Sequence, residues 1–508
     1  MSNESKTIHQ LTLNLDFREL VTLNMKIMNN FLHPIVNPKS IAFFGASNRF
    51  SAMGTNQLNS LLDLGFEGHI YPVHPREDRV LGLKAYPHVQ ELPEVPDLAV
   101  MVLPTRVVPG VMEECGQKGI KHAVVVSGGF REVGGEGVEL EKRLVAITDQ
   151  YGIRFLGPNC LGVANPHHKF NVTFLPFEGR PGFIGFASQS GSFITQMFGY
   201  MNRYHMGFST GISVGNEADV DIVDAMEYLA ACPHTKVIGL YIETIRRGRE
   251  FIDLARSIVP HKPVVAYYVG GSEAGQQAGL SHTAALAGPD ELYDGVFRQS
   301  GIIRAQSIPE LFDFCWVLGA GLRLSGNRVI IQTHSGGPGA AAADACSRTG
   351  LVLAEISRQT REKLSQLVPS TGSMNNPIDL TFSKSPEDFF RVIPDILLAE
   401  SYCDGLLVYF LAPGQLIRRT MESGGIHPDQ IPQLMEKIFD DQAKTMTGLM
   451  VKHQKPLIGY TFQSHEELYV QKLLHHGVPV FPSPERAARA MAALADYSLL
   501  VDKITSNT

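Results

Sequence analysis

The stretch from Gly279 to Gly288 carries residues that could do covalent chemistry. It places one histidine, His282, between two small hydroxyl residues, Ser281 and Thr283, and continues in small residues. Histidine changes charge near neutral pH, and one of its ring nitrogens can attack or accept a transferable group. The same pattern also fits a histidine that opens a helix with Ser281 as its N-cap. These ten residues therefore indicate either a nucleophile or a helix start.

A serine-rich turn is the second candidate. It joins a predicted strand to a predicted helix and consists of Ser188, Gln189, Ser190, Gly191 and Ser192. Hydroxyl groups, backbone N–H groups and a helix N-terminus together suit one small anion. Ordinary turn and capping chemistry is the alternative.

Glu243 is the third candidate because it directly follows a predicted strand, 237–242. A carboxylate at that place could accept a hydrogen bond from an imidazole and orient the ring. Its alternative role is a salt bridge with Arg246 or Arg247. The carboxyl ends of parallel strands meet at one edge of a sheet, so we expect the serine turn, Glu243 and His282 to face one crevice.

The elements that must position these groups alternate between short apolar runs and longer helical stretches, which is typical of βαβ units around parallel sheets. The fold class predicted is therefore α/β. The predicted strands are 40–44, 70–73, 98–103, 122–126, 183–187, 209–214, 237–242, 263–269, 328–332, 405–410, 456–460 and 478–481. Helices are predicted at 193–200 and 340–346, and Asn376–Asp379 is predicted as a turn.

Small and turn-forming residues follow each strand of the first block. Backbone N–H groups at a glycine turn entering a helix can bind an anion, and Arg49 could contact a phosphate. The region is similar to half of a dinucleotide-binding domain, but the GxGxxG spacing is missing after Phe44, which weakens an NAD assignment.

Composition excludes several classes of protein. The 508 residues suggest about three domains, and 44 basic against 51 acidic residues give a net charge of −7, which offers no bulk attraction to nucleic acid or to an anionic membrane. An anionic substrate would thus need a local site. Six cysteines without a CxxC pair favour a reducing cytoplasm. We see no membrane-length apolar run, no signal-peptide core and no metal-binding Cys/His spacing.

Taken together, the blocks resemble the α subunit of the NDP-forming acyl-CoA synthetases, the superfamily that includes ADP-forming acetyl-CoA synthetase and succinyl-CoA synthetase. The resemblance runs from about Pro34 to Leu499, and its most specific part is Ser281–Gly288 followed by 290–293 and 297–301. The other matching segments are 45–47, 157–159, 188–191, 215–216, 336–339 and 376–379.

The resemblance implies a Rossmann-like CoA-binding domain followed by two flavodoxin-like domains. The implied ranges are 32–177 for the CoA-binding domain, 178–323 for the phosphohistidine-bearing domain and 324–508 for the ligase-CoA domain. Residues 1–31 form an N-terminal extension to which we assign no function.

The implied reaction converts acyl-CoA, phosphate and ADP into the acid, CoA and ATP. It passes through an acyl phosphate and a phosphohistidine at His282, with Glu243 holding the ring. The phosphate would be bound by Ser188, Gln189, Ser190 and Gly191. The CoA-binding residues implied in the first domain are Gly45, Ser47, Arg49, Pro75, Pro104, Ser127, Gly128, Gly129 and Asn159.

An ATP-grasp domain is missing from this sequence. The resemblance therefore implies a separate ATP-grasp β subunit in a heterotetramer, with ADP or ATP and Mg²⁺ bound there. Two residues depart from the family: Ala284 replaces a common glycine, and His334 replaces a common asparagine. Two other classes stay open, a CoA- or acyl-CoA-binding regulatory protein without turnover and, less favoured, an NAD(P)-dependent oxidoreductase.

Overall fold

The computed structural model describes residues 27–272, 274–275, 288–321, 323–381, 385–412 and 414–506. They form two compact units, a larger one of residues 27–202 and 206–311 and a smaller one of residues 203–205 and 312–506. His282 and its neighbours Ser281, Thr283 and Ala284 lie outside the described residues, so their roles stay predictions.

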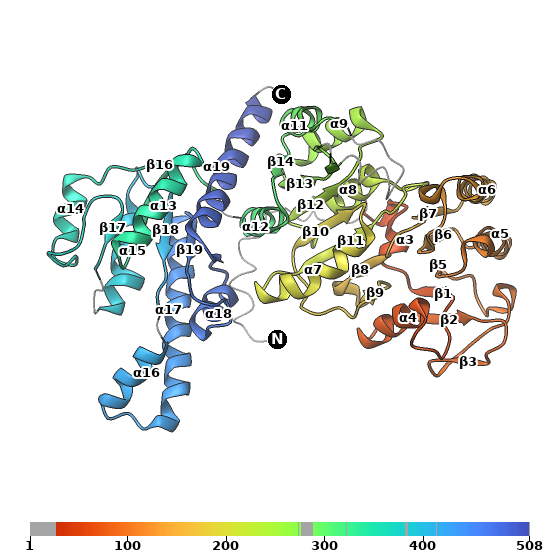
Figure 1. Ribbon diagram of the computed structural model, residues 1–508, viewed down its shortest axis with the longest axis horizontal. Helices are drawn as coiled ribbons and strands as arrows, with labels where there is room; N and C mark the ends of the chain where they lie inside the picture. The colour runs from red at the N-terminus through yellow and green to blue at the C-terminus, as the bar shows by residue number, and fades with distance from the viewer. Residues whose placement is uncertain are drawn as a thin grey trace. The chain divides into compact units, whose positions relative to one another are not determined.

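The larger unit contains two main sheets (Figure 1) and a small two-stranded sheet of β3 and β4 at residues 79–84. The first has five parallel strands in the order β2 (His69–Val73), β1 (Ser40–Phe44), β5 (Leu98–Met101), β6 (His122–Val125) and β7 (Arg154–Leu156). The chain leaves β1 for β2 on one side and later returns to β5 on the other side. Open α/β sheets bind ligands at the carboxyl ends of their strands beside such a reversal, here between β1 and β5.

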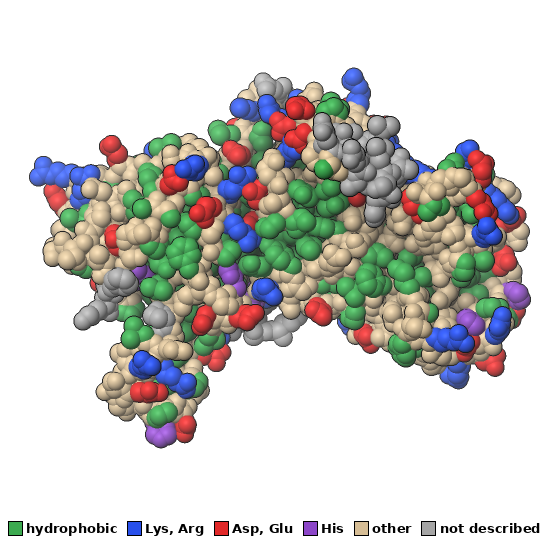
Figure 2. All heavy atoms as spheres, viewed as in Figure 1, with side chains coloured by type: hydrophobic (Ala, Val, Ile, Leu, Met, Phe, Trp, Pro, Cys, Tyr) green, Lys and Arg blue, Asp and Glu red, His purple; other side chains and the backbone are tan. Residues whose placement is uncertain are grey.

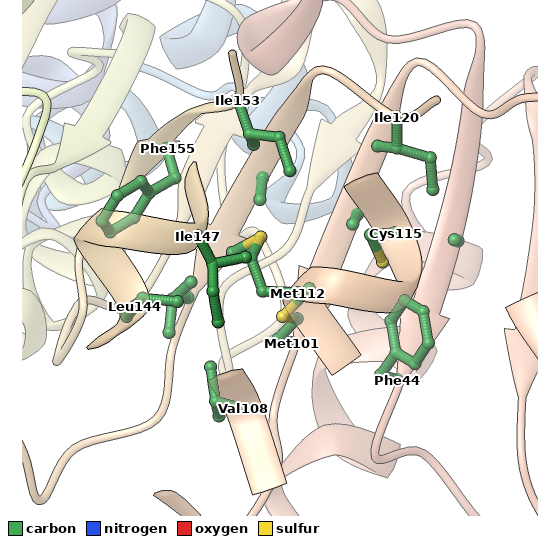
Figure 3. Packing of buried hydrophobic residues seen from close by; sticks show 14 of the residues in the cluster. Phe44, Met101, Val108, Met112, Cys115, Ile120, Leu144, Ile147, Ile153 and Phe155 are labelled. Atoms are coloured by element: carbon green, nitrogen blue, oxygen red, sulfur yellow. The ribbon is translucent and has the colours of Figure 1, made fainter. Parts of the chain in front are cut away.

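Helices cover both faces of this sheet. α5 (Val108–Lys118) and α6 (Glu136–Tyr151) lie together on one face (Figure 1), and right-handed crossovers in opposite directions place α4 (Met53–Asp63) on the other. Figure 3 shows Met112 of α5 and Leu144 and Ile147 of α6 in one apolar cluster with strand residues such as Met101 and Phe155. This core holds the strands of the first sheet in place, and with them the loops at their carboxyl ends.

The second sheet has seven strands, five of them parallel. Their order is β14 (Ile303–Ala305), β13 (Val264–Tyr268), β12 (Val237–Ile242), β10 (Ile184–Ser188), β11 (Phe208–Ser213), β8 (Val163–Asn165) and β9 (Phe170–Asn171). Its helices are α7 (Gly191–Arg203), α8 (Ile222–Ala231), α9 (Gly248–Ile258) and α11 (Asp290–Ser300). β8 and β9 are antiparallel and come from within the range 32–177 of the predicted first domain, yet they extend this second sheet.

The smaller unit is a third α/β layer around a six-stranded parallel sheet. Its strands are β15 (Arg328–Thr333), β16 (Val352–Leu353), β17 (Ile378–Asp379), β18 (Gly405–Tyr409), β19 (Leu457–Tyr460) and β20 (Val480–Phe481). Its helices are α13 (Gly336–Arg348), α14 (Arg358–Leu364), α15 (Ile393–Ala399), α16 (Gly414–Ser423), α17 (Ile431–His453), α18 (Leu468–His475) and α19 (Pro484–Ser506). α12 (Ile308–Gly319) carries the chain from the larger unit into the smaller one.

The turn predicted for Asn376–Asp379 is wrong in its second half, because Ile378–Asp379 form the parallel strand β17 beside β15. The Asn376 side chain explains the difference. Its Oδ1 accepts a hydrogen bond from the N–H of Ile331, and its Nδ2 donates to the carbonyl of Val329. A side-chain amide thus replaces one rung of backbone pairing and brings the segment alongside the sheet.

The α/β fold class is confirmed, and each predicted strand is present with ends shifted by at most two residues. The short strands β3 (Arg79–Val80), β4 (Leu83–Lys84), β7, β8, β9, β14, β16 and β17 were not predicted. Figure 2 shows acidic and basic side chains mixed on the visible face, in keeping with a net charge of only −7. Among the described residues, none of the helices is both long enough and apolar enough to cross a membrane.

Gly45, directly after β1, offers a test of how tightly the first sheet's edge is built. Its φ is +93°, and a Cβ there would lie 1.9 Å from the carbonyl oxygen of Val102. We expect Gly45→Ala to cost about 3 kcal/mol or more, because it combines an unfavourable φ with a backbone clash. Calorimetric unfolding would measure the loss.

Gly65→Ala is the matched control. Gly65 also has a positive φ, +76°, but its Cβ would meet nothing within 4 Å. This variant should cost only about 1 kcal/mol. Equal losses in melting temperature for the two variants would contradict the close approach at Gly45.

Candidate functional site

A cavity of about 380 Å³ lies in the larger unit, where the loops after the strands of its two sheets meet. A volume in this range suits a small-molecule ligand. From the first sheet and its following loops the cavity is lined by Met53, Val126, Gly128, Arg131, Asn159, Cys160 and Leu161, and Phe174 comes from the segment after β9 of the second sheet. From the second sheet it is lined by Gln189, Ser190, Gly191, Ser192, Gly215, Asn216, Glu217, Glu243, Thr244 and Arg246.

The serine turn sits at the start of α7, as its sequence predicts. Ser190 and Gly191 line the cavity at the N-terminus of this 13-residue helix, where unpaired backbone N–H groups attract anions. Ser188 is fully buried, and its Oγ donates to the carbonyl of Ser190 at 2.7 Å. The Ser188 hydroxyl therefore fixes the turn, while Ser190 and Gly191 present it to the cavity.

Close packing favours glycine at position 191. A Cβ at this position would lie 3.1 Å from Cγ and 3.2 Å from the backbone nitrogen of Leu161. Leu161 itself donates its N–H to the Ser213 hydroxyl at 3.1 Å. The first turn of α7 is thus pressed against the segment that enters β8.

Glu243 lines the same cavity, directly after β12. Arg246 and Arg247, the two arginines expected as its alternative partners, both bind other groups. Arg247 is in salt bridges with Asp221 and other carboxylates, and Arg246 donates to the backbone carbonyl of Glu217 at 2.5 Å. The structure therefore brings together the serine turn and Glu243, two of the three predicted groups; the third, His282, is outside the described residues.

Glu217 was not predicted as a site residue, although it lies in the loop after β11. It lines the cavity but is only 4% exposed, and its φ is +55°. Burial raises the pKa of Glu217 to about 8, and hydrogen bonds from Gln189 and from the N–H of Ile222, together with the charge of Arg131, offset only part of that effect. A neutral carboxyl group therefore lies in the cavity wall at pH 7. One signal in the sequence could have identified it, because Glu217 lies in Gly215-Asn216-Glu217, directly after a predicted strand.

A polar network, also missed by sequence reasoning, joins the glycine loop after β6 to this Glu217 loop. Asn216 Nδ2 donates to Glu132 Oε2 at 2.6 Å, and Asn159 Nδ2 donates to Asn216 Oδ1 at 3.3 Å. Glu132 Oε1 in turn accepts the N–H of Gly129 at 2.5 Å. The guanidinium of Arg131 donates to the backbone carbonyl of Asn216.

The residues predicted to bind a nucleotide all follow strands of the first sheet and so lie along its carboxyl edge. Of these, Gly128 and Asn159 line the cavity; those that do not are Gly45, Ser47, Arg49, Pro75, Pro104, Ser127 and Gly129. The Ser127 hydroxyl donates to the carbonyl of Leu103 at 2.6 Å and accepts its N–H at 3.0 Å, which holds the loops after β5 and β6 together. Arg49 is exposed beside Ser47.

Three family models match the chain in sequence order. They are a CoA binding domain over residues 39–166, a succinyl-CoA ligase like flavodoxin domain over 181–318 and a ligase-CoA domain over 329–407. The predicted order of a CoA-binding domain and two succinyl-CoA ligase-like domains is confirmed, whereas the predicted domain boundaries stay predictions.

Known relatives share most of this chain. It is 37% identical over 462 residues to the α subunit of ADP-forming acetate–CoA ligase II of Pyrococcus furiosus, covering 91% of this chain and 97% of that protein. It is also 37% identical to ADP-forming acetate–CoA ligase I of Archaeoglobus fulgidus, but spans only 64% of that protein's length.

One similar solved structure is the dinucleotide forming acetyl-coenzyme A synthetase 1 of Ca. Korarchaeum cryptofilum, in complex with phosphate and ADP. Its TM-score is 0.82 at 33% identity, and the match covers 94% of this chain and 98% of that chain.

The raised pKa of Glu217 predicts a specific dependence of stability on pH. The folded chain holds that pKa near 8, against 4.5 for an ordinary glutamate. Between these values the folded state binds one proton more than the unfolded state, so the contribution of Glu217 to stability falls as pH rises, by at most about 1.4 kcal/mol per pH unit. Glu217→Gln removes this pH-dependent loss of stability. The melting temperature of the variant, measured relative to that of the wild type, should therefore rise by a few °C between about pH 5 and pH 8.

Differential scanning fluorimetry at several pH values would measure the effect. Glu227→Gln, an exposed position on α8 of the same sheet, is the matched control and should follow the wild type. A difference between Glu217→Gln and the wild type that stays constant with pH would show that Glu217 is ionised in the folded protein.

Proposed function

This chain belongs to the family of the ADP-forming acetate–CoA ligase α subunits, and from that premise we propose that it is the catalytic α subunit of an ADP-forming acyl-CoA synthetase. A phosphate oxygen attacks the thioester carbonyl of acyl-CoA, and the CoA thiolate leaves. A ring nitrogen of His282 then attacks the phosphorus of the acyl phosphate, and the carboxylate leaves. An oxygen of the ADP β-phosphate finally takes the phosphoryl group from the imidazole. The covalent intermediate divides one difficult transfer into separate steps.

The observation that carries this proposal is the meeting of an anion-binding helix start with a carboxylate in one cavity. Ser190 and Gly191 supply N–H groups and the positive end of the α7 dipole for the phosphoryl oxygens. Glu243 lies in the wall of the same cavity, where it can accept a hydrogen bond from the second nitrogen of the His282 imidazole. Phosphoryl transfer needs mainly such positioning and charge stabilisation.

We assign CoA to the carboxyl edge of the first sheet, for which the matching CoA binding domain gives support. The glycine turn at Gly45 and the exposed guanidinium of Arg49 provide N–H groups and positive charge for phosphates. Gly128 and Asn159 connect this edge to the cavity, so a pantetheine arm entering there would bring its thioester to the phosphate. The other residues assigned to this site are Ser47, Pro75, Pro104, Ser127 and Gly129.

The nucleotide half of the reaction is assigned to a partner. An ATP-grasp β subunit, joined to this chain in a heterotetramer, would bind ADP or ATP with Mg²⁺. The name α subunit for two relatives supports a partner, and so does the greater length of the A. fulgidus protein. All six cysteines are buried and free, which supports a reducing, cytoplasmic location.

Transfer through His282 predicts an acid-labile phosphoryl group on the protein. The chain, co-expressed with an ATP-grasp partner, should become labelled from radioactive phosphate in the presence of a suitable acyl-CoA, found by screening a panel. His282→Ala should abolish the label and lower phosphate-dependent CoA release by about 10³-fold or more, because the nucleophile is lost.

His88→Ala, at an exposed position in the first sheet's region, is the control and should keep both activities. A wild-type protein that binds acyl-CoA tightly but neither becomes labelled nor releases CoA would favour the regulatory alternative instead. Tight binding of NAD but not of CoA would favour an oxidoreductase.

A further inference from the structure

We infer that Gln189 is a positioning residue that holds the Glu243 backbone in place for catalysis, and is not itself a ligand of the phosphate. This inference rests on the function proposed above. It changes the role of Gln189, one of the four residues predicted to bind the phosphate, and it identifies the contacts that hold Glu243 in place.

The Gln189 side chain is bonded to the two residues that follow β12. Its Oε1 accepts the N–H of Glu243 at 2.5 Å and the N–H of Thr244 at 3.0 Å, and its Nε2 donates to the carbonyl of Thr244 at 2.8 Å. Two N–H groups face Oε1, so the orientation of the amide is determined by its partners. With only 7% of the residue exposed, little solvent competes for these bonds.

The reason for this arrangement lies in the strand pairing. β10 and β12 pair in parallel up to Ser188 and Tyr241, and the N–H of Gln189 still donates to the carbonyl of Tyr241 at 3.2 Å. The chain then turns away into α7, so the backbone of the serine turn cannot pair with Glu243. A glutamine amide has the donor and acceptor of a peptide group, and it continues the ladder past the end of the strand.

Three of the four hydrogen-bonding positions of the Gln189 amide are used by the backbone that follows β12. A glutamine side chain has two N–H donors and two acceptor lone pairs. Both lone pairs of Oε1 and one N–H of Nε2 are occupied by Glu243 and Thr244. The Gln189 side chain also lowers the pKa of the Glu217 carboxyl group in the cavity wall. We therefore assign phosphate binding to Ser190, Gly191 and the start of α7.

A second side chain holds the same turn one residue later. The hydroxyl of Tyr293, on α11, accepts the N–H of Ile245 at 3.2 Å. Glu243 thus begins a segment whose backbone is tied from two sides, by Gln189 and Tyr293. A displacement of about 1 Å in a catalytic group can reduce a rate by about 100-fold, so such fixing has a direct catalytic consequence.

The test is a double-mutant cycle on the rate of phosphoenzyme formation, with chain and ATP-grasp partner co-expressed. Gln189→Met keeps the side-chain length but removes the three hydrogen bonds to the backbone that follows β12. At saturating phosphate it should slow labelling of His282 by about 10- to 100-fold, because Glu243 is no longer held. The KM for phosphate should stay within about twofold of the wild type. In a Glu243→Gln background, the same substitution should change the rate by no more than about twofold, because it acts through Glu243.

Gln196→Met makes the same chemical change at an exposed position of α7 and should behave as the wild type. Should Gln189→Met not fold, Gln189→Glu replaces it in the cycle, with the same criterion. Equal effects of the Gln189 substitution in both backgrounds, or a phosphate KM that rises with the loss of rate, would make Gln189 a phosphate ligand and overturn the inference alone. A wild-type protein without any phosphoenzyme would overturn the proposed function and this inference with it.

Discussion

The larger unit depends on one polar junction, in which Asn216 of the second sheet is bonded to the glycine loop of the first. Asn216 is buried, and its amide reaches the carboxylates of Glu132 and Glu141, while its carbonyl accepts hydrogen bonds from Arg131 and Arg246. Leaving such a buried amide unpaired would cost about 1–3 kcal/mol for each missing partner. These bonds hold the carboxyl edges of the two sheets together, and the cavity lies where the two edges meet.

Much of the site could be predicted because parallel strands place their carboxyl ends at a common edge. The strands β10 and β12 could be predicted from their apolar runs, and the residues that follow two neighbouring parallel strands face the same crevice. Ser190, Gly191 and Glu243 could be grouped for that reason. The same logic located the glycine turns of the first sheet, and the family resemblance added the chemistry that the pattern alone left open.

The rest was hidden because it depends on partners that are distant in sequence. In the sequence, Gln189 is one of several polar residues of a predicted anion-binding turn. Only the structure shows that its amide oxygen accepts hydrogen bonds from backbone N–H groups 54 and 55 residues further along the chain. Nothing local in the sequence indicates that Glu217 is desolvated, since the groups around it include Arg246 from after β12 and Arg131 from the loop after β6. β8 and β9 are too short to give a periodic signal, and only their pairing with β11 shows which sheet they join.

The electrostatics of the cavity follow from these hidden partners. A chain with a net charge of −7 does not attract anions as a whole, and two carboxyl groups in an anion site would repel a phosphate. Burial reduces this conflict, because the raised pKa of Glu217 favours its neutral form at pH 7. Arg131 and Arg246 line the same cavity beside the start of α7. The local field can therefore be positive where the global charge is negative, which is the condition that an anionic substrate of this chain requires.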